Sequence, residues 1–327
     1  MEEIGCHFKF ERLEGDMYHN TKLLLSSGRN CLRYIIKERN IKTLYIPYFL
    51  CESISEVAKS ENISIKYYHI DENLMPVEVD LVTLKENTYL YIVNYYGMLS
   101  DKILLLTKNH KNIIVDNTHD FYDKRDYGVD TIYNYRKYFG VPDGACIISG
   151  DLKYNPEYEK GKSLDKVIEM LSRDETGEFF HYPTFEEADK YYKNEGLRYM
   201  SNFTENYLRA INYQDILNKR QINYRTISAI VSKYNTIDAK SKGLTYMYPL
   251  YVEKDGEEIR KFLKENNVYS LRLWANVNWN GANSQEISTA DNMVLLPIDQ
   301  RYNANDMEHI GHTIQRYYEE KGKVLKR

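Results

Sequence analysis

The chain has 327 residues, of which 43% are hydrophobic and 28% are charged, and its formal net charge is −4. This composition is typical of a soluble globular protein with enough sequence for one large core or two domains. Acidic and basic residues are interspersed, so charge gives no reason to expect a nucleic acid or an anionic membrane as a partner.

The amino terminus lacks the features of a signal peptide. Residues 1–5 are acidic, and no apolar stretch in the chain approaches the roughly 20 residues that span a bilayer. The four cysteines, Cys6, Cys31, Cys51 and Cys146, are scattered and form no CxxC pair. We therefore expect a cytoplasmic protein with reduced thiols, no disulfide framework and no metal site.

Short apolar runs alternate with helical patterns through the first half of the chain. Ser27 and Gly28 precede an apolar stripe, which predicts a capped helix start. The expected strands lie at residues 43–46, 63–70, 88–95, 112–116, 131–135 and 145–149, with helices at 52–61 and 101–109. Near-continuous apolar strands that alternate with helices predict the α/β class, with a mainly parallel central sheet flanked by helices.

The second half of the chain has a different texture. Charged, helix-forming sequence runs through residues 165–229. A smaller unit follows, with expected strands at 246–252 and 269–274, a helix at 257–265, an apolar run at 293–298 and a closing helix from residue 306. We therefore predict a large domain over residues 1–235 and a smaller C-terminal α/β or α+β domain over residues 236–327.

Ligands in open parallel sheets bind beyond the carboxyl ends of the strands, so reactive residues at those positions are the site candidates. The first is the turn of Ser27, Gly28 and Arg29 at a helix N-terminus. Free backbone N–H groups and the helix dipole favour a phosphate at such a turn. Taken alone, this turn is better explained by a glycine-containing helix cap.

The second and third candidates follow two predicted strands. Asp116 ends an apolar strand and His119 lies three residues later, although a turn aspartate with a surface histidine is the common reading of that pattern. Lys137 follows residues 131–135 and precedes a Pro142-Asp143-Gly144 turn. Most lysines are solvated surface charges, but aromatic and apolar neighbours would desolvate this amine and favour its neutral, nucleophilic form.

The three candidates match the needs of one cofactor. Pyridoxal phosphate (PLP) requires an amine for an imine, a carboxylate that faces its ring nitrogen and an anion pocket for its phosphate. The chain supplies the phosphate turn at Gly28, the carboxylate at Asp116 and the amine at Lys137, each beside a predicted strand.

On these residues the sequence resembles the DegT/DnrJ/EryC1/StrS family of fold-type-I, PLP-dependent sugar aminotransferases, and the similarity runs over most of the chain. The matching segments are Glu3-Ile4-Gly5, Ser27-Gly28-Arg29, Ile46-Pro47, Asn94-Tyr95-Tyr96-Gly97, Val115-Asp116 with His119, Arg136-Lys137 with Pro142-Asp143-Gly144, Arg220 with Asn223-Tyr224, Val268-Tyr269 with Trp274, and Pro297-Ile298-Asp299-Gln300-Arg301-Tyr302.

The resemblance implies a role for each matched site residue. Lys137 matches the lysine that forms the Schiff base and shuttles the proton between substrate and cofactor. Asp116 matches the acid that pairs with the pyridinium nitrogen, and His119 matches the residue that contacts the phenolic oxygen. Gly28 and Arg29 match the phosphate-binding turn.

The chain departs from the family pattern at three of these places. Arg29 stands where many members have a small hydroxyl residue, so its backbone N–H would have to serve. Asn134 takes the place of a common serine, which alters one phosphate contact. Cys51 lies where many relatives have the aromatic residue that stacks on the cofactor ring.

Other residues are assigned to the substrate and to a second subunit. Tyr95 and Tyr96 are candidates to line the substrate pocket, with packing as the alternative. Trp274 and Trp279 are expected to be packing residues, with the border of the substrate pocket as the alternative for Trp274. Relatives of this fold type are usually homodimers, and Asn223 or Tyr224 of a second subunit are the candidates to complete the phosphate site.

The activity implied is transamination by a ping-pong mechanism in polysaccharide biosynthesis. An amino acid, glutamate by resemblance, gives its amino group to the cofactor, and a keto-sugar linked to a nucleotide accepts it. A PLP-dependent sugar dehydratase or other lyase is the first alternative, although some dehydrating relatives carry histidine in place of the lysine. A non-catalytic relative that keeps the fold for binding is the second.

Overall fold

The computed structural model describes residues 8, 10–77, 79, 84, 86–176, 195–237, 245–279 and 281–324. Two interpretations of the sequence fall outside this part of the chain. The family match at Glu3-Ile4-Gly5 lies outside the described residues, and the side chain of Trp279, which we expected to be a packing residue, is not described either.

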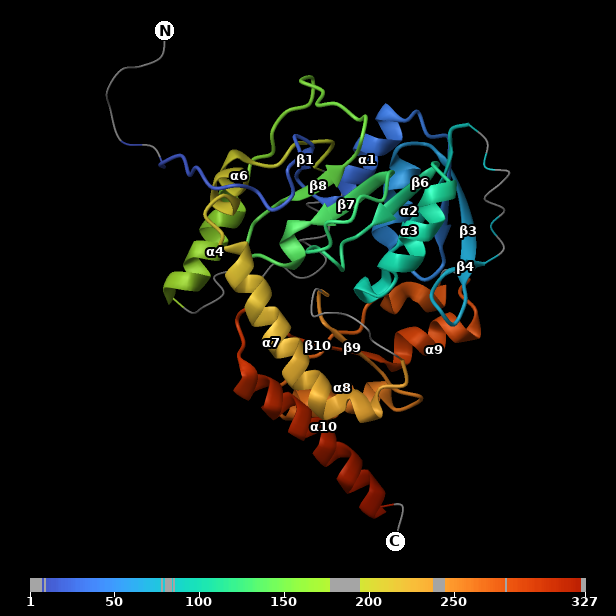
Figure 1. The fold of residues 1–327 in the computed structure, drawn as a ribbon, viewed down its shortest axis with the longest axis vertical. Helices are drawn as coiled ribbons and strands as arrows, with labels where there is room; N and C mark the ends of the chain where they lie inside the picture. Colours follow the sequence, from blue (N-terminus) through green and yellow to red (C-terminus); the bar gives the residue numbers. More distant parts are fainter. Residues whose placement is uncertain are drawn as a thin grey trace.

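An eight-stranded sheet forms the centre of the molecule (Figure 1). Its strands lie in the order β1-β8-β7-β6-β5-β2-β3-β4, and the pairs from β3 to β7 are parallel, whereas β1, β8 and β4 pair antiparallel. The strands are β1 (Leu24–Leu25), β2 (Thr43–Pro47), β3 (Ser64–Ile70), β4 (Pro76–Val77), β5 (Thr88–Val93), β6 (Ile113–Asp116), β7 (Asp130–Asn134) and β8 (Ala145–Ile148). The predicted mainly parallel sheet is confirmed.

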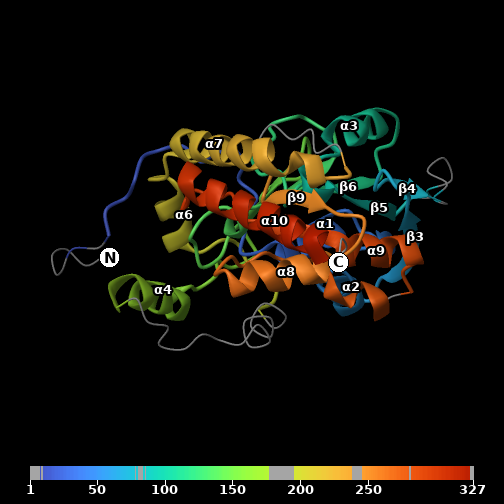
Figure 2. The same cartoon turned by 90° about the horizontal axis from the view of Figure 1, so that it is seen from below.

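Helices cover both faces of this sheet. The helices of the first half are α1 (Gly28–Glu38), α2 (Glu52–Ser60) and α3 (Ser100–Asn109). Helices α1 and α2 pack against each other, and α3 lies on the opposite side of the sheet (Figure 2). The predicted start of α1 is confirmed, because the Ser27 hydroxyl accepts a hydrogen bond from the Asn30 N–H at the helix N-terminus.

The second half of the chain adds six helices and a two-stranded sheet to the described residues. The helices are α4 (Leu164–Thr176), α6 (Asn202–Leu208), α7 (Tyr213–Val231), α8 (Gly256–Glu265), α9 (Ser284–Asn292) and α10 (Ala304–Val324). Strands β9 (Tyr248–Tyr251) and β10 (Met293–Leu296) pair antiparallel. Helices α7 and α10 run side by side below the large sheet (Figures 1 and 2). Among the described residues, no helix combines the length and the apolarity that a membrane crossing requires.

One predicted strand is wrong. Residues 269–274 make only a single bridge, between Leu271 and Leu295, and form no strand. Tyr269 is exposed, and Trp274 has a φ of 56°, which lies in the left-handed region and breaks an extended chain. The strand expected at 88–95 likewise ends early, because Tyr95–Gly97 forms a 3₁₀ turn, η2, around a left-handed Tyr96.

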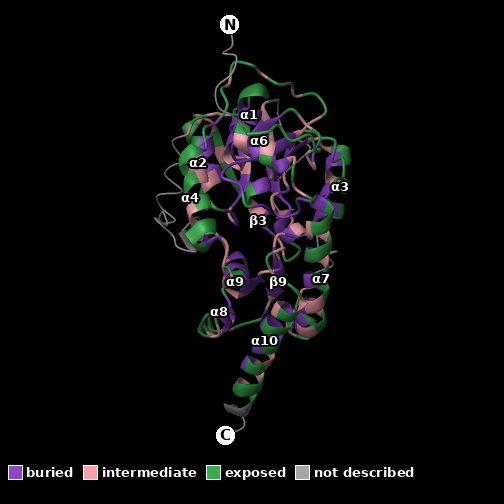
Figure 3. Ribbon diagram, turned by 90° about the vertical axis from the view of Figure 1, so that its left-hand side faces the viewer, coloured by how far each residue is buried: buried purple, intermediate pink, exposed green. Residues whose placement is uncertain are grey.

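Buried hydrophobic residues of the described chain form three clusters. The largest cluster surrounds the eight-stranded sheet, and a second is built from β9, β10, α8 and α10 (buried residues are purple in Figure 3). The largest also takes Trp274, Met293 and Leu295 from the second half of the chain, and the third contains Tyr138 and Tyr213. The second cluster also takes Tyr224, Ile227 and Val231 from α7, which a boundary at residue 235 would place in the first domain. The position of the domain boundary stays a prediction.

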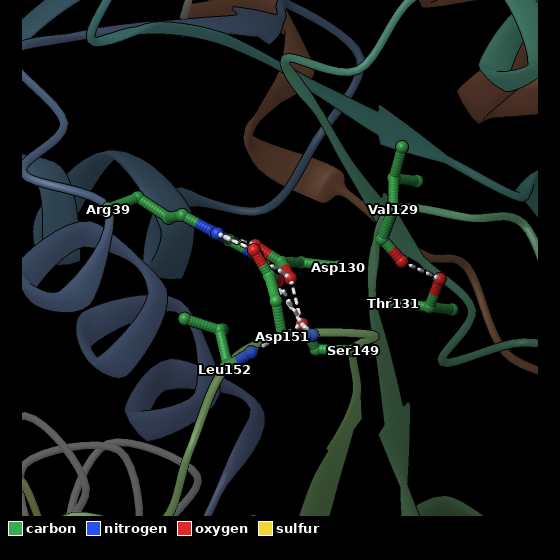
Figure 4. Close-up of polar contacts among 7 residues, drawn as sticks. All are labelled: Arg39, Val129, Asp130, Thr131, Ser149, Asp151 and Leu152. Atoms are coloured by element: carbon green, nitrogen blue, oxygen red, sulfur yellow. Dashed lines mark hydrogen bonds and ion pairs between the residues drawn. The ribbon is translucent and has the colours of Figure 1, made fainter.

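Charged and polar side chains link the C-terminal end of α1 to the start of β7 (Figure 4). Arg39, at the C-terminal end of α1, donates two hydrogen bonds of 2.8 Å to the two carboxylate oxygens of Asp130. Asp130 begins β7, is buried, and also accepts a bond from the Ser149 hydroxyl. This bidentate pair sets the position of α1 relative to β7, so that Gly28 at the other end of α1 lies beside Asn134 at the other end of β7.

We predict that Arg39→Met destabilises the fold by about 3 kcal/mol, because it leaves the Asp130 carboxylate buried without its cation. We place the loss at the lower end of the expected range because the Arg39 side chain is 22% exposed. Urea denaturation measures the free energy of unfolding. Arg198→Met is the matched control, since its ion pair with Glu159 is exposed and should contribute no more than about 1 kcal/mol. Equal losses in the two variants would contradict the assigned role.

Candidate active site

The strand order of the sheet reverses between β2 and β5. The chain proceeds from β2 outward to β3 on one side, and from β5 through β6 to β7 on the other. In open α/β sheets the crevice beyond the carboxyl ends of the strands at such a switch point is the usual ligand site. The predicted site residues Tyr95, Asp116 and Lys137 follow or end β5, β6 and β7.

Asp116 is held at the carboxyl end of β6 by two donors. The Tyr91 hydroxyl donates to its Oδ2 at 2.7 Å, and the Thr118 N–H donates to its Oδ1 at 3.0 Å. A carboxylate has about four lone-pair positions, so each oxygen can still accept another hydrogen bond. The carboxylate is therefore oriented but retains the capacity to bind a ligand.

Lys137 ends a short 3₁₀ turn, η3 (Tyr135–Lys137), directly after β7. The Asn134 side chain starts this turn by accepting a hydrogen bond from the Arg136 N–H at 3.1 Å. The Lys137 side chain is half-buried, and its Nζ lies 5.1 Å from the centroid of the Tyr246 ring. Within the described part of the chain, this amine has no hydrogen-bond acceptor and no ion-pair partner.

The charges of Asp116 and Lys137 both act on the Cys51 thiol. The Cys51 side chain is exposed, yet desolvation by the surrounding protein raises the pKa of its thiol. The charge of Asp116 adds to this rise and the charge of Lys137 opposes it. Both charges are therefore within electrostatic reach of the Cys51 sulfur, although Asp116 and Lys137 are 21 positions apart in the sequence.

His119 is stacked between two tyrosines. Its ring lies 6.0 Å from the Tyr96 ring and 5.9 Å from the Tyr246 ring, with interplanar angles of 17° and 15°. Burial, with a smaller contribution from the charge of Lys137, lowers the pKa of His119 to about 3. The ring is therefore neutral at pH 7. Its Nδ1 accepts a long hydrogen bond of 3.4 Å from the Tyr96 N–H, which assigns the ring proton to Nε2.

The backbone next to Tyr96 is shaped by a close approach of three segments. Tyr96 has a φ of 54°, and Gly97 follows with a φ of 69°. A Cβ atom on Gly97 would lie 3.0 Å from the Thr245 side chain and 3.1 Å from the His119 carbonyl oxygen. Gly97 is therefore required both for its conformation and for the space that lets His119 approach η2.

Tyr95 and Trp274 are buried in this region. The Tyr95 hydroxyl donates to the Phe49 carbonyl at 2.6 Å, and its ring meets Trp274 edge-on at 5.4 Å. The Trp274 ring lies 5.7 Å from His119 and 5.6 Å from Tyr96. These contacts support the packing interpretation of both residues, while direct contact with a substrate stays a prediction.

The predicted phosphate turn lies where α1 meets the end of β7. A Cβ atom on Gly28 would lie 3.5 Å from the Asn134 Nδ2, so the two residues are neighbours. The Gly28 N–H has no acceptor among the residues that the structure describes. The Arg29 side chain extends toward α2, with its guanidinium 4.0 Å from Glu56. The Arg29 side chain therefore lies beside α2, and the predicted phosphate contact of Gly28 and Arg29 through their backbone groups stays a prediction.

The structure adds residues that the sequence did not single out. Tyr91 orients Asp116, and Tyr246 contacts both His119 and Lys137. Because the chain contains 32 tyrosines, no local signal distinguishes these two.

The candidates for a contact from a second subunit are placed differently from our expectation. The Asn223 amide donates to the carbonyls of Ile298, Asp299 and Tyr302 and is buried within its own chain. Tyr224 is likewise buried, with its ring 5.0 Å from the Tyr248 ring. A role for either residue in another subunit's phosphate site stays a prediction that these contacts do not favour.

Among known proteins, the chain is similar to proteins of solved structure. No protein-family model matches the chain, and no curated protein matches it. A DegT/DnrJ/EryC1/StrS aminotransferase from Brucella abortus covers 90% of this chain and 85% of its own, with a TM-score of 0.59 and 12% identity. The chain has the fold of these aminotransferases. The expected fold-type-I architecture, with its helix-flanked sheet, is therefore confirmed.

Two further neighbours give the same result. A sugar aminotransferase from Micromonospora echinospora covers 90% of this chain and 86% of its own, with a TM-score of 0.57 and 14% identity. An aminotransferase of pseudoaminic acid biosynthesis from Helicobacter pylori covers 93% of this chain and 88% of its own, with a TM-score of 0.59 and 12% identity. The fold match extends over both parts of the chain, whereas identity this low says nothing about individual site residues.

We predict that the His119 ring stays neutral down to about pH 4, because burial lowers its pKa to about 3. Imidazole ¹⁵N shifts, assigned by comparison with His119→Gln, measure this directly. The folded pKa lies below the unfolded value of about 6.5, so the stability contribution is complete above pH 6.5 and is lost as the pH falls toward 3. Buried His19, with a pKa of about 4, acts in the same direction. Protonation of His119 above pH 5 would contradict the assignment.

Proposed function

We propose that the protein is a PLP-dependent aminotransferase that holds its cofactor covalently on Lys137. The observation that carries this proposal is the Lys137 amine, which lies half-buried beside the Tyr246 ring and has no ionic partner in the described structure. A lysine in such a place is disfavoured unless its amine has another use, since buried charges are normally paired. The oriented Asp116 carboxylate and the neutral His119 complete the arrangement.

The described residues fit PLP. Asp116 would face the ring nitrogen, the Nε2–H of His119 would donate to the phenolic oxygen, and the N-terminus of α1 at Gly28 with Asn134 would bind the phosphate. When bound, PLP supplies an electron sink that stabilises negative charge at the substrate carbon next to the nitrogen.

The chain's own groups then have separate tasks. The Asp116 carboxylate, held by Tyr91 and Thr118, would pair by charge with a protonated ring nitrogen of the cofactor. The Lys137 Nζ would move the proton to or from the substrate carbon next to the nitrogen. It is suited to this task because it lies beside the stacked rings of His119 and Tyr246 without an ionic partner in the described structure. These buried aromatic rings limit the access of water to the site.

The substrates are proposed from the family likeness. We propose glutamate as the amino donor and a nucleotide-linked keto-sugar as the acceptor, in a pathway of polysaccharide biosynthesis. In support, the solved neighbours include the sugar aminotransferase from M. echinospora, and a Streptococcus pneumoniae neighbour has been solved in a PLP form and a PMP form. A sugar dehydratase is the runner-up, which the retained Lys137 disfavours, and a non-catalytic binding protein comes after it.

We also propose a homodimer. Helix α4 exposes Leu164, Ile168 and Leu171, whose spacing places them along one face of the helix. An exposed apolar stripe of this kind is typical of a protein interface. The unpaired Cys31 and Cys146 support our proposal of a cytoplasmic location.

We predict that the purified protein binds PLP with a visible absorbance band and that Lys137→Ala abolishes covalent attachment. Borohydride reduction followed by mass spectrometry of the tryptic peptide identifies the modified lysine. Lys102→Ala is the matched control, because Lys102 is exposed on α3. A Lys137→Ala protein that keeps the same borohydride-trappable chromophore would rule out the proposal.

We predict that glutamate converts the visible spectrum of the wild-type complex to that of the aminated cofactor, with 2-oxoglutarate released in equal amount. The proton transfer requires the Lys137 amine, so Lys137→Arg should slow this conversion by roughly 10²-fold or more. Absorbance and 2-oxoglutarate are followed together. Release of ammonia without accumulation of the aminated cofactor would instead support the lyase.

A further inference from the structure

Arg220 is a buried cation that lies away from solvent, in the middle of α7. It is 0% exposed, and its guanidinium is held without a carboxylate partner in the described structure. One terminal nitrogen donates to the carbonyls of Thr245 and Tyr246 at 2.8 and 2.6 Å, and the other donates to the Gln300 side chain at 3.3 Å. Burying an arginine in this way is costly, so its retention calls for a specific use.

The groups that Arg220 contacts flank Lys137. The Tyr138 ring, 4.6 Å from the guanidinium carbon, belongs to the residue that follows Lys137 in the chain. The Tyr246 carbonyl belongs to the residue whose ring lies beside the Lys137 amine and stacks on His119. One guanidinium thus contacts the ring of the residue that follows Lys137 and the backbone of the residue whose ring lies beside the Lys137 amine.

Gln300 closes this arrangement. Its side-chain amide donates to the Tyr138 carbonyl at 2.7 Å, while its oxygen accepts from Arg220. The neighbouring carboxylate, Asp299, is engaged by Arg301 through bonds of 2.7 and 2.9 Å. Burial opposes ionisation of Asp299, but the bonds from Arg301 and the charge of Arg220 lower its pKa. Asp299 therefore remains ionised and bound to Arg301, and the amide of Gln300 is the side chain that reaches Arg220.

The position of Arg220 in α7 explains why a single residue makes all these contacts. Tyr213, near the start of α7, packs in the cluster that contains Tyr138, whereas Tyr224, one turn after Arg220, packs in the cluster of β9 and β10. Arg220 lies between Tyr213 and Tyr224 on α7, the helix labelled in Figure 1, and therefore between these two cores. A planar guanidinium with five donors can bind groups from both sides at once, which a lysine cannot do.

We propose that Arg220 is a positioning residue that sets the orientation of the Lys137 amine through Tyr138 and Tyr246. The inference rests on the proposed function, since it is the use of Lys137 that gives this geometry its purpose. Loss of the guanidinium would free the Tyr246 ring and the backbone after Lys137. It would also remove the positive charge held between Tyr138 and Tyr246, which changes the electrostatic environment of a cofactor bound at Lys137.

The test uses the full-length protein loaded with PLP and compares Arg220→Met, Arg220→Lys and Arg225→Met. Arg225 lies on the same helix but is exposed, which makes it the matched control. Two readouts report on orientation without reference to turnover: the visible circular dichroism of bound PLP and the midpoint of its absorbance-against-pH titration. Thermal unfolding of each variant shows whether the fold is retained.

We expect Arg220→Met to lose most of the visible circular dichroism and to raise the titration midpoint by about half a pH unit or more, less than a directly contacting charge would cause. Arg220→Lys should restore the midpoint in part, because it keeps the charge, but not the circular dichroism, because it lacks the planar fork. Arg225→Met should match the wild type in both readouts.

A folded Arg220→Met protein with wild-type circular dichroism and midpoint overturns the inference. If that variant does not fold, Gln300→Ala decides, since it breaks the links to Arg220 and Tyr138 while leaving the guanidinium in place. It should then weaken the circular dichroism in the same sense, and an unchanged signal overturns the inference. Wild-type protein that binds no PLP refutes the proposed function and this inference together. If the wild type binds PLP but the variants keep the wild-type readouts, only the role of Arg220 is refuted.

Discussion

The parallel pairing of β6 with β7 is the constraint on which the candidate site depends. Asp116 is paired with Ile132 in this ladder, so both strands deliver their following residues to the same edge of the sheet. Neighbouring strands lie about 4.8 Å apart, which keeps the carboxylate at the end of β6 close to the turn that carries Lys137. A shift of the register by one residue would turn Asp116 into the opposite face and separate the two charges.

Tyrosine has a particular part in keeping this edge ordered. The Tyr91 hydroxyl orients Asp116, while the Tyr95 hydroxyl is used by the backbone of Phe49. The rings of Tyr96 and Tyr246 enclose His119 and hold it neutral. A tyrosine ring provides apolar surface, and its hydroxyl can bind a polar group. These tyrosines can therefore exclude water from this edge of the sheet and still bind the Asp116 carboxylate and the Phe49 carbonyl.

Helix α7 connects two hydrophobic cores of the molecule next to the candidate site. Helix α7 begins in the core that contains Tyr138 and ends in the core of the two-stranded sheet. Arg220, buried in the middle of α7, contacts the Tyr246 carbonyl and the Tyr138 ring, which belong to the two residues that flank Lys137. The C-terminal part of the chain therefore acts on the site through packing, even though Asp116, His119 and Lys137 all come from the large sheet.

The sequence by itself determined the parallel sheet, the capped start of α1 and the short set of reactive residues after the strands. These features depend on local periodicity, helix capping and the residue types that follow each apolar run, all of which can be read along the chain. It could not exclude a strand at residues 269–274, because the apolar residues there serve a left-handed Trp274 that packs on distant rings.

Only the tertiary structure decided which side chains surround Lys137. Tyr246 is 109 positions away and Arg220 is 83 positions away, and both belong to residue types that occur throughout the chain. Their roles come from the crossing of segments in space, and no short-range pattern encodes such a crossing. The same physical reason applies to the hydrogen bonds of Asn223, because its three carbonyl partners belong to the segment after β10, which only the tertiary fold brings against α7.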